Sequence, residues 1–339
     1  MLTGHGDDLF RYPDIRINFS SNVYNHFEHD GLFRHLASCM TCVTNYPEPT
    51  PQSLEAALAA CMGLEASQVM AGNGATEAIY LMAQTWRASR TAILVPTFAE
   101  YADACRLHGH SVEYIQSLDG LGGGVQMLWL CNPNNPTGQV MPRETLLLAM
   151  RNHPRTLFVV DASYAVFTRQ PLLTARECAS LPNVLMLHSM TKEFAIPGLR
   201  LGFLTGCSAL LDRVREQRMP WSVNSLAQEA GLYLLQHRAD YLLPLDLLLS
   251  ERQRMATAFE QMGIATRPSD SHILLCRHPR LPASVLKDRL ALEHGLLIRD
   301  ASNFESLDAH CFRIAVQTPE ENDMLLHAMS QYAQLPHVP

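Results

Sequence analysis

The stretch SMTKEFAIPGLRLGF, residues 189–203, decides how this sequence is interpreted. It follows an apolar run, Val184 to Leu187, that is typical of a buried strand. Lys192 comes just after two hydroxyl residues, Ser189 and Thr191, and Arg200 follows a segment broken by proline and glycine. Such a set can bind a phosphorylated aldehyde, because the lysine forms a Schiff base while the hydroxyls and guanidinium hold the phosphate. An ordinary strand-to-helix turn with a surface lysine fits the stretch equally well, so the context has to decide.

Length and composition predict a chain with a large buried core and about two domains. The chain has 339 residues, of which 47% are hydrophobic and 17% charged. A net charge of -7 argues against a nucleic-acid partner. The sequence contains no apolar run long enough for a transmembrane helix and no apolar signal-peptide core near its start, so we expect a cytoplasmic protein without a membrane partner.

One group of cysteines and histidines raises the question of a metal. Cys39 and Cys42 form a CxxC, and His26, His29 and His35 lie just upstream. Structural zinc sites usually pair two such ligand couples, and the sequence has no second CxxC. The nine scattered cysteines fit reduced thiols in a cytoplasm, so we expect no metal in the functional site.

Apolar runs alternate with helical patterns along most of the chain. The candidate strands cover residues 92–95, 112–115, 127–131, 157–160, 184–187 and 201–205. Continuous apolar strands separated by helices predict an α/β fold, with a mostly parallel sheet flanked by helices in a large domain. A long helical stretch over 239–262 is followed by a mixed pattern that predicts a small α+β domain. We expect an N-terminal arm over 1–40 that joins the small domain, a large domain over 41–238 and the small domain over 239–339.

Unusual residues follow the predicted strands, where ligands bind in such sheets. Gly72 to Glu77 is a glycine-containing turn before a helix whose free N–H groups could hold a phosphate, although most such turns are only turns. Phe98 follows the next strand and could stack on a flat ring or pack in the core. Asn135 lies in a rigid turn that could place an amide on a ring substituent.

Asp161 ends an apolar strand, and Tyr164 lies three residues further on. A carboxylate buried there has to be paired, and a protonated ring nitrogen would serve, although capping of a helix explains the aspartate equally well. Taken together, the loops supply every part of a pyridoxal-phosphate site.

Several of these strings together resemble a known family. The strings NNPTG at 134–138, Asp161 to Tyr164, and SMTK followed by GLRLGF resemble fold-type-I pyridoxal-phosphate enzymes of the class I/II aminotransferase family, over roughly residues 15–330. The resemblance implies pyridoxal 5'-phosphate as cofactor. It implies a homodimer with shared active sites.

The resemblance also implies a role for each matched residue. Lys192, Asp161 and Tyr164 would be catalytic, with Lys192 forming the Schiff base and Asp161 keeping the ring nitrogen protonated. Arg313 would hold the substrate carboxylate. The cofactor-binding residues would be Gly74, Ala75, Thr76, Phe98, Asn135, Asp161, Tyr164, Ser189, Thr191, Lys192, Arg200 and, toward the partner subunit, Tyr46.

Two groups within the family compete, and both act on phosphorylated amino compounds. The N-terminal strings at 5–9 and 17–22 resemble the L-threonine O-3-phosphate decarboxylases of cobalamin synthesis, which make aminopropanol phosphate. The histidinol-phosphate aminotransferases, which pass an amino group to 2-oxoglutarate, are the alternative. Candidates for the substrate phosphate are His5, Asn22 and Arg299, although His5 lies in a terminus and Arg299 could pair with a surface acid. A catalytically silent binding module with the same fold is a third alternative, which the intact Lys192 and Asp161 disfavour.

Overall fold

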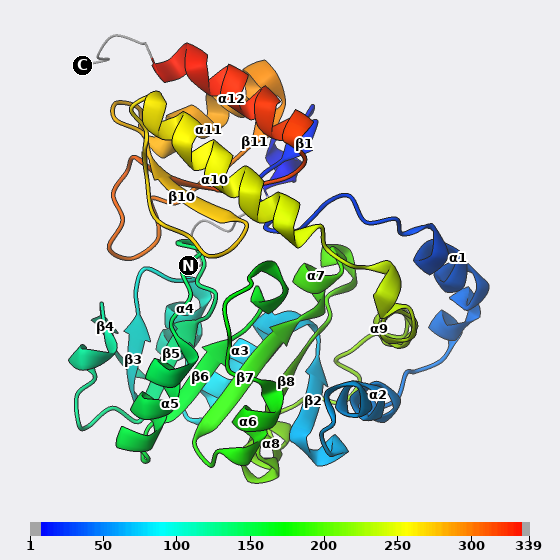
Figure 1. Ribbon diagram of the computed structural model, residues 1–339. Helices are drawn as coiled ribbons and strands as arrows, with labels where there is room; N and C mark the ends of the chain where they lie inside the picture. The colour runs from blue at the N-terminus through cyan, green and yellow to red at the C-terminus, as the bar shows by residue number, and fades with distance from the viewer. Residues whose placement is uncertain (1–7, 334–339) are drawn as a thin grey trace.

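A seven-stranded sheet forms the centre of the larger part of the molecule (Figure 1). The computed structural model describes residues 8–333. In spatial order the strands are β2 (Val69–Gly72), β8 (Gly202–Gly206), β7 (Val184–Ser189), β6 (Leu157–Asp161), β5 (Met127–Cys131), β3 (Arg90–Leu94) and β4 (Ser111–Ile115). Neighbouring strands are parallel, except that β8 runs antiparallel to both β2 and β7. The expected α/β fold with a mostly parallel sheet is therefore confirmed.

Side chains of the central strands alternate between two separate cores. In β6, Val159 lies in one core while its neighbours Phe158 and Val160 lie in the other. In β5, Trp129 and Leu128 divide in the same way. A sheet that is buried on both faces has no polar side, which explains why these strands read as unbroken apolar runs.

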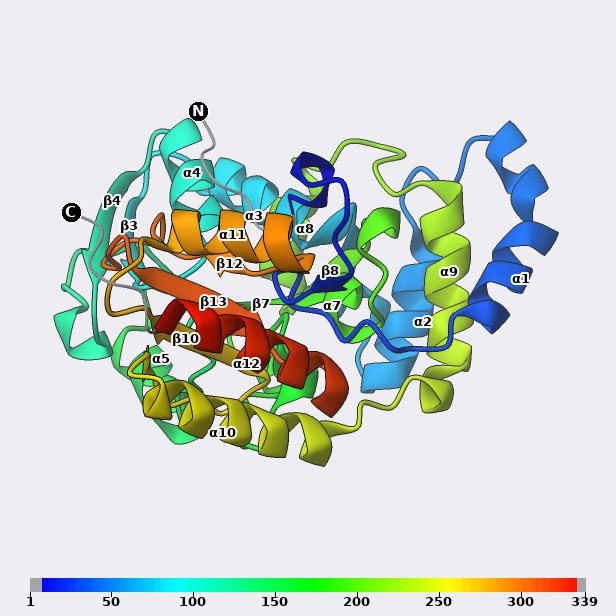
Figure 2. The same ribbon diagram turned by 90° about the horizontal axis from the view of Figure 1, so that it is seen from above.

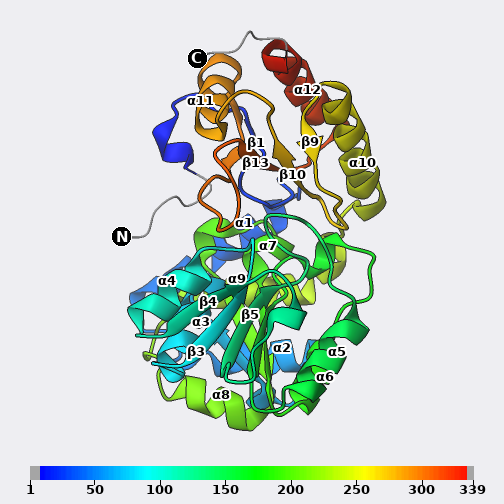
Figure 3. The ribbon, with the colours of Figure 1, turned by 90° about the vertical axis from the view of Figure 1, so that its left-hand side faces the viewer.

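Helices cover both faces of this sheet (Figure 3). Ala78 of α3 packs in the first core, whereas Leu146 of α5 and Cys178 of α6 pack in the second. The helices of this part are α2 (Gln52–Met62), α3 (Gly74–Thr85), α4 (Glu100–Leu107), α5 (Arg143–Asn152), α6 (Ala175–Ser180), α7 (Met190–Glu193), α8 (Ser208–Arg215) and α9 (Ser225–Gln236). Short 3-10 helices are η3 (Ala66–Gln68), η4 (Leu118–Gly120), η5 (Ala165–Phe167) and η6 (Pro197–Leu199).

A second, four-stranded sheet lies above the first in the view of Figure 1. Its strands, in spatial order, are β12 (Arg299–Asp300), β13 (Cys311–Ala315), β10 (Ile273–Arg277) and β9 (Ala265–Thr266), and all pairs are antiparallel. Its helices are α10 (Leu245–Gln261), α11 (Ala283–His294) and α12 (Pro319–Ala333). The helix that we expected to begin at 239 begins only at Leu245, after the 3-10 turn η7 (Arg238–Asp240) and Pro244, because proline is disfavoured inside a helix.

The N-terminal segment touches both parts of the molecule. After η1 (Leu9–Arg11), β1 (Ile17–Asn18) pairs in parallel with β11 (Leu296–Leu297) of the small part. The chain then crosses to α1 (Asp30–Ser38) and η2 (Met40–Thr44), which lie beside α9 (Figure 2). The domain boundaries stay a prediction. Within residues 8–333, none of the helices has the length and apolar character that crossing a bilayer would take.

Candidate active site

One cavity of about 260 Å³ brings most of the expected site residues together. Its floor lies at the carboxyl ends of the parallel strands, where ligands bind in open α/β sheets. Its opposite wall comes from the small sheet and from the N-terminal segment. The expected residues that line it are Asn22, Ala75, Thr76, Phe98, Asn135, Asp161, Tyr164, Ser189, Thr191, Lys192, Arg200, Arg299 and Arg313.

The N-terminus of α3 forms one end of the cavity. Ala75 and Thr76 lie in its first turn, where backbone N–H groups have no partner inside the helix. Gly74 has a φ of 78°, and a Cβ there would lie 2.7 Å from Nη2 of Arg200. A Cβ on Gly202 of β8 would lie 2.6 Å from the backbone nitrogen of Ala75. The two glycines therefore allow the strand, the helix terminus and a guanidinium to converge at an anion-binding position.

Two hydroxyl residues complete this end. Ser189 ends β7 and Thr191 belongs to α7, and both are buried. The Oγ1 atom of Thr191 is buried without a hydrogen-bond partner within residues 8–333. A buried hydroxyl in that condition is destabilising, and a phosphate oxygen in the cavity would accept its hydrogen bond.

Asp161, at the end of β6, is the buried carboxylate of the floor. Its Oδ2 accepts a hydrogen bond of 2.5 Å from the hydroxyl of Tyr101, and its Oδ1 accepts one of 2.9 Å from the backbone N–H of Ser163. Burial nevertheless raises the pKa of Asp161, despite these bonds and the positive charge of Lys192. A further cation facing the carboxylate would stabilise its ionised form.

Tyr101 lines the cavity but was not predicted as a site residue. Its ring is fully buried and stacks on Trp129, with ring centres 5.0 Å apart. Phe98, which was expected, lies three residues earlier, in the turn just before α4, and both residues line the cavity. That spacing, which places residues on one side of a helical turn, was the available signal for Tyr101.

Residues after β1 close over the lysine. Lys192 Nζ donates a hydrogen bond of 2.6 Å to the carbonyl oxygen of Ser21. Asn22, with a φ of 56°, donates from Nδ2 to the hydroxyl of Tyr164 over 3.0 Å. Ser20 and Ser21 line the cavity too and were not expected.

Arg313 and Arg299 form the wall opposite the floor. They lie directly across from each other in the β12–β13 pair, so their side chains project from the same face. Arg313 donates from Nη1 to Oδ1 of Asn135 over 2.7 Å, while its Nε has no hydrogen-bond partner among the described residues. Burial lowers the pKa of Arg313 to about 9, and the positive charge of Arg299 acts in the same direction. Phe304, also not expected, lines the cavity beside the guanidinium of Arg299.

Two expected residues within the described part of the chain, Gly74 and Tyr46, do not line this cavity. Tyr46 is 84% exposed and packs against Trp221, with ring centres 5.2 Å apart. Its role toward a partner subunit stays a prediction. His5 lies outside the described residues.

Comparison with known proteins agrees with this geometry. The model of the family described as aminotransferase class I and II matches residues 14–329. The chain belongs to this family. A threonine-phosphate decarboxylase of Salmonella typhimurium is 32% identical over 334 residues, which cover 94% of this chain and 91% of that protein. A histidinol-phosphate aminotransferase of Desulfitobacterium hafniense is 29% identical over 324 residues, covering 89% and 87%.

Solved structures give the same picture. The crystal structure of L-threonine-O-3-phosphate decarboxylase from Porphyromonas gingivalis matches with a TM-score of 0.91 and 34% identity, covering 94% of this chain and 100% of that one. A histidinol-phosphate aminotransferase from Sinorhizobium meliloti, in complex with pyridoxal-5'-phosphate, has a TM-score of 0.83 at 20% identity, covering 95% and 92%, and so shares the fold.

Pyridoxal 5'-phosphate is the cofactor of this family and of this chain, and the cavity fits it. The α3 N-terminus and the Thr191 hydroxyl, which has no hydrogen-bond partner among the described residues, suit a phosphate. Burial raises the pKa of Asp161, and a protonated ring nitrogen would stabilise its ionised form. Lys192 would bind the aldehyde carbon, and Phe98 would lie against the ring. When bound, the cofactor supplies a ring that accepts electrons from a bond broken at the substrate Cα.

Proposed function

We propose that this chain decarboxylates L-threonine O-3-phosphate to CO2 and aminopropanol phosphate, a step of cobalamin synthesis. Two relatives that are more than 30% identical over most of the chain, one a sequence and one a crystal structure, carry the name threonine-phosphate decarboxylase. The family itself requires only a pyridoxal-phosphate enzyme. The choice of substrate therefore rests on the wall of the cavity that faces the cofactor residues.

The pair of buried arginines on that wall supports this substrate most directly. Arg313 and Arg299 are 3% and 7% exposed and project from one face of the small sheet. Arg299 donates a hydrogen bond to Asn303, and Arg313 donates to Asn135 and Ser20. Anions in the cavity would further offset the cost of burying two guanidinium groups side by side. Threonine phosphate carries two anionic groups, a carboxylate for Arg313 and a phosphate for Arg299. Arginine suits both groups, because its planar fork binds such oxygens in pairs.

The grip on these two anions selects the reaction. Because the cofactor would supply an electron-accepting ring, the residues that orient the substituents of Cα would decide which bond at that carbon is broken. Arg313, held by Asn135 and by the carbonyl oxygen of Ser20, fixes the position of the carboxylate. Orientation of the carboxylate by Arg313 would favour loss of CO2, whereas a pocket that oriented the Cα hydrogen instead would favour transamination.

We assign to Lys192 the transfer of a proton to the substrate. Its Nζ lies at 2.6 Å from the carbonyl oxygen of Ser21, at the junction of the cofactor residues and the N-terminal segment. Its amine would be placed to deliver a proton to the carbon that loses CO2. A lysine ammonium in such a position can serve as a general acid.

Transamination of the histidinol-phosphate type is the second candidate. A relative with that name is 29% identical over 89% of this chain, and its reaction also needs a phosphate site and a carboxylate site, the latter for 2-oxoglutarate. The same arginines would serve both reactions, so only the products separate them.

A homodimer and a cytoplasmic location are parts of the same proposal. Tyr46 and Trp221 are 84% and 47% exposed and lie against each other outside the cavity. Exposed aromatic side chains are common in protein interfaces, because they bury a large area with few rotatable bonds. If a partner subunit covers this pair, Tyr46 of this chain would reach the cofactor site of that partner subunit.

Product analysis with both substrates tests the proposal. The enzyme loaded with pyridoxal phosphate is incubated with threonine phosphate, and separately with histidinol phosphate and 2-oxoglutarate, with Lys192→Ala as the inactive control. We expect CO2 and aminopropanol phosphate in the first reaction and no glutamate in the second. Glutamate without CO2 would establish the aminotransferase instead.

A further inference from the structure

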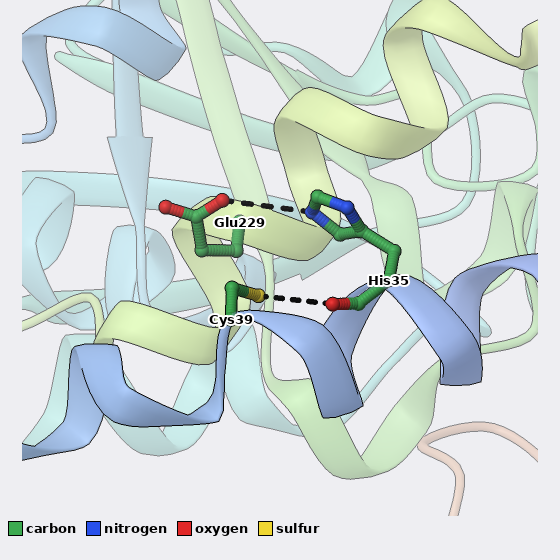
Figure 4. Close-up of side chains that lie close together, drawn as sticks. All are labelled: His35, Cys39 and Glu229. Carbon is green, nitrogen blue, oxygen red and sulfur yellow. Dashed lines mark hydrogen bonds and ion pairs between the residues drawn. The ribbon is translucent and has the colours of Figure 1, made fainter.

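We propose that His35, Cys39 and Glu229 form a binding site for one divalent transition-metal ion of the zinc class. The site lies where α1 packs on α9, and none of the three residues lines the active-site cavity (Figure 4). Figure 4 shows the carboxylate of Glu229 facing the imidazole of His35, with the thiol of Cys39, the residue just after α1, beside them and donating to the backbone carbonyl oxygen of His35 over 3.2 Å. The ligand atoms of all three lie within 4.8 Å of one another.

Helix geometry brings two of the ligands together. His35 lies in the last turn of α1, and Cys39 follows the helix four residues later. Residues four apart lie on the same side of a helix, so the imidazole and the thiol face α9 together. Glu229 extends from α9, and its Oε2 lies 3.5 Å from Nε2 of His35. Ligand atoms around zinc are separated by similar distances, so small side-chain rotations are enough to close the site.

The ring of His35 is held in position by an aromatic neighbour. The ring stacks on Tyr233 with centres 4.9 Å apart, and Tyr233 lies four residues after Glu229 on the same face of α9. The Nε2 atom of His35 is buried, and apart from its ion-pair contact of 3.5 Å with Oε2 of Glu229 it makes no hydrogen bond among the described residues. A histidine nitrogen in this position can bind a metal ion that the carboxylate and the thiol also reach.

Nitrogen, sulfur and oxygen ligands together suit zinc better than magnesium or calcium, which prefer oxygen alone. Binding would release the thiol proton to solvent, because the thiolate is the ligand. The side chains of His35 and Glu229 are 32% and 38% exposed, which leaves the fourth position accessible to water. The sequence raised His35 and Cys39 as candidate ligands but gave no signal for Glu229, because that residue lies 190 residues after Cys39.

An ion at this position would fasten α1 to the body of the large domain. The segment that follows α1 and η2 leads directly to Tyr46, the residue expected at the partner subunit. Since only the folded chain brings the three ligands together, the ion would stabilise the native state by mass action. The role is structural and independent of the reaction catalysed in the cavity.

Titration of the untagged holoenzyme tests the site. After treatment with a chelator, the protein is titrated with Zn²⁺ against a metal indicator and, separately, with Co²⁺ while its near-ultraviolet absorbance is recorded. We expect one equivalent to bind, a thiolate-to-Co²⁺ charge-transfer band, and a higher thermal midpoint with Zn²⁺. Cys39→Ser should remove the band, and both Cys39→Ser and Glu229→Gln should weaken Zn²⁺ binding by about tenfold or more.

Cys61→Ser is the matched control, because Cys61 is an exposed thiol in α2 outside the cluster. It should keep the band, the affinity and the thermal shift. Glu229→Gln changes no volume, so it reports on the ligand even if the cysteine variant folds poorly. Failure of the wild type to bind one equivalent would overturn the proposal, as would unchanged binding by Glu229→Gln.

Discussion

At Asp161, burial and hydrogen bonding act in opposite directions on one carboxylate. Burial raises its pKa, while the hydroxyl of Tyr101 and the backbone N–H of Ser163 favour the ionised form. The sequence predicted Asp161 and Lys192, because each follows a strand-like run at the edge where ligands bind. The contact of Tyr101 with Asp161 and that of Ser21 with Lys192 were not predicted, because they join positions 60 and 171 residues apart, which local patterns do not encode.

Tyr101→Phe should slow the reaction without unfolding the protein. Phenylalanine keeps the stack on Trp129 but removes the hydrogen bond to the carboxylate. A hydrogen bond to a charged group contributes roughly 1.5–3 kcal/mol, so we expect kcat to fall about 10- to 100-fold. The visible absorbance of the cofactor-bound enzyme should also change its pH dependence. An unaltered pH profile and rate would show that Tyr101 does not support Asp161.

Arg299→Gln and Arg313→Gln should separate the two anions of the substrate. Aminopropanol phosphate keeps the phosphate but has lost the carboxylate. We therefore expect Arg299→Gln to weaken product inhibition about 10- to 100-fold, and Arg313→Gln to leave it nearly unchanged while raising the KM for threonine phosphate. The two inhibition constants and the KM values are the measurements. The reverse pattern would exchange the roles of the two arginines.

At the scale of the elements, the contact between β8 and the N-terminus of α3 shapes the phosphate end of the cavity. The sequence predicted the central strands, because apolar runs are local signals. It did not predict that β8 runs antiparallel, which depends on how the chain returns across the sheet after α7. Helix α10 starts later than predicted because Pro244 precedes it. The prediction followed the apolar pattern and gave this proline too little weight.

Gly202→Ala should disturb that contact. The new methyl group would lie 2.6 Å from the backbone nitrogen of Ala75 and 2.8 Å from the carbonyl oxygen of His188. Overpacking of this kind costs about 1–3 kcal/mol, and the shift of α3 should weaken retention of the cofactor. Gly198→Ala is the control, since a Cβ there meets nothing within 4 Å. Denaturant unfolding and cofactor dissociation are the measurements, and equal behaviour of the two variants would contradict this account.

At the scale of the whole molecule, the cavity exists only because the small sheet lies over the carboxyl ends of the large one. Arg299 and Arg313 come from one sheet, and Asp161 and Lys192 come from the other or the helix after it. Sequence patterns predicted the two sheets separately, but packing between them depends on surfaces that no periodicity describes. The family resemblance, not the pattern, linked Arg313 to the site in advance.

Buried histidine makes the stability of the molecule depend on pH. Burial lowers the pKa of His272 to about 3, and the positive charges of Arg313 and Lys192 act in the same direction. Between the unfolded value of 6.5 and about 3, the unfolded chain binds a proton that the native state does not. The free energy of unfolding therefore falls as the pH decreases through this range, by up to about 1.4 kcal/mol per pH unit.

His272→Phe should remove this contribution while keeping an aromatic ring against Phe167. Urea unfolding at about pH 7.5 and about pH 5.5 gives the change for each protein, and the variant should lose about 1 kcal/mol less than the wild type. Equal losses would show that His272 is protonated in the native state.

The fate of the hydrogen on Cα tests the proposed reaction most directly. The holoenzyme is incubated with L-threonine O-3-phosphate that carries deuterium at Cα, and the product is analysed by mass spectrometry. Decarboxylation breaks the bond to the carboxylate and leaves the Cα–D bond intact, so we predict aminopropanol phosphate that retains the deuterium, with one CO2 per product. A keto product that keeps its carboxylate, with the deuterium released to solvent, would contradict the proposed function.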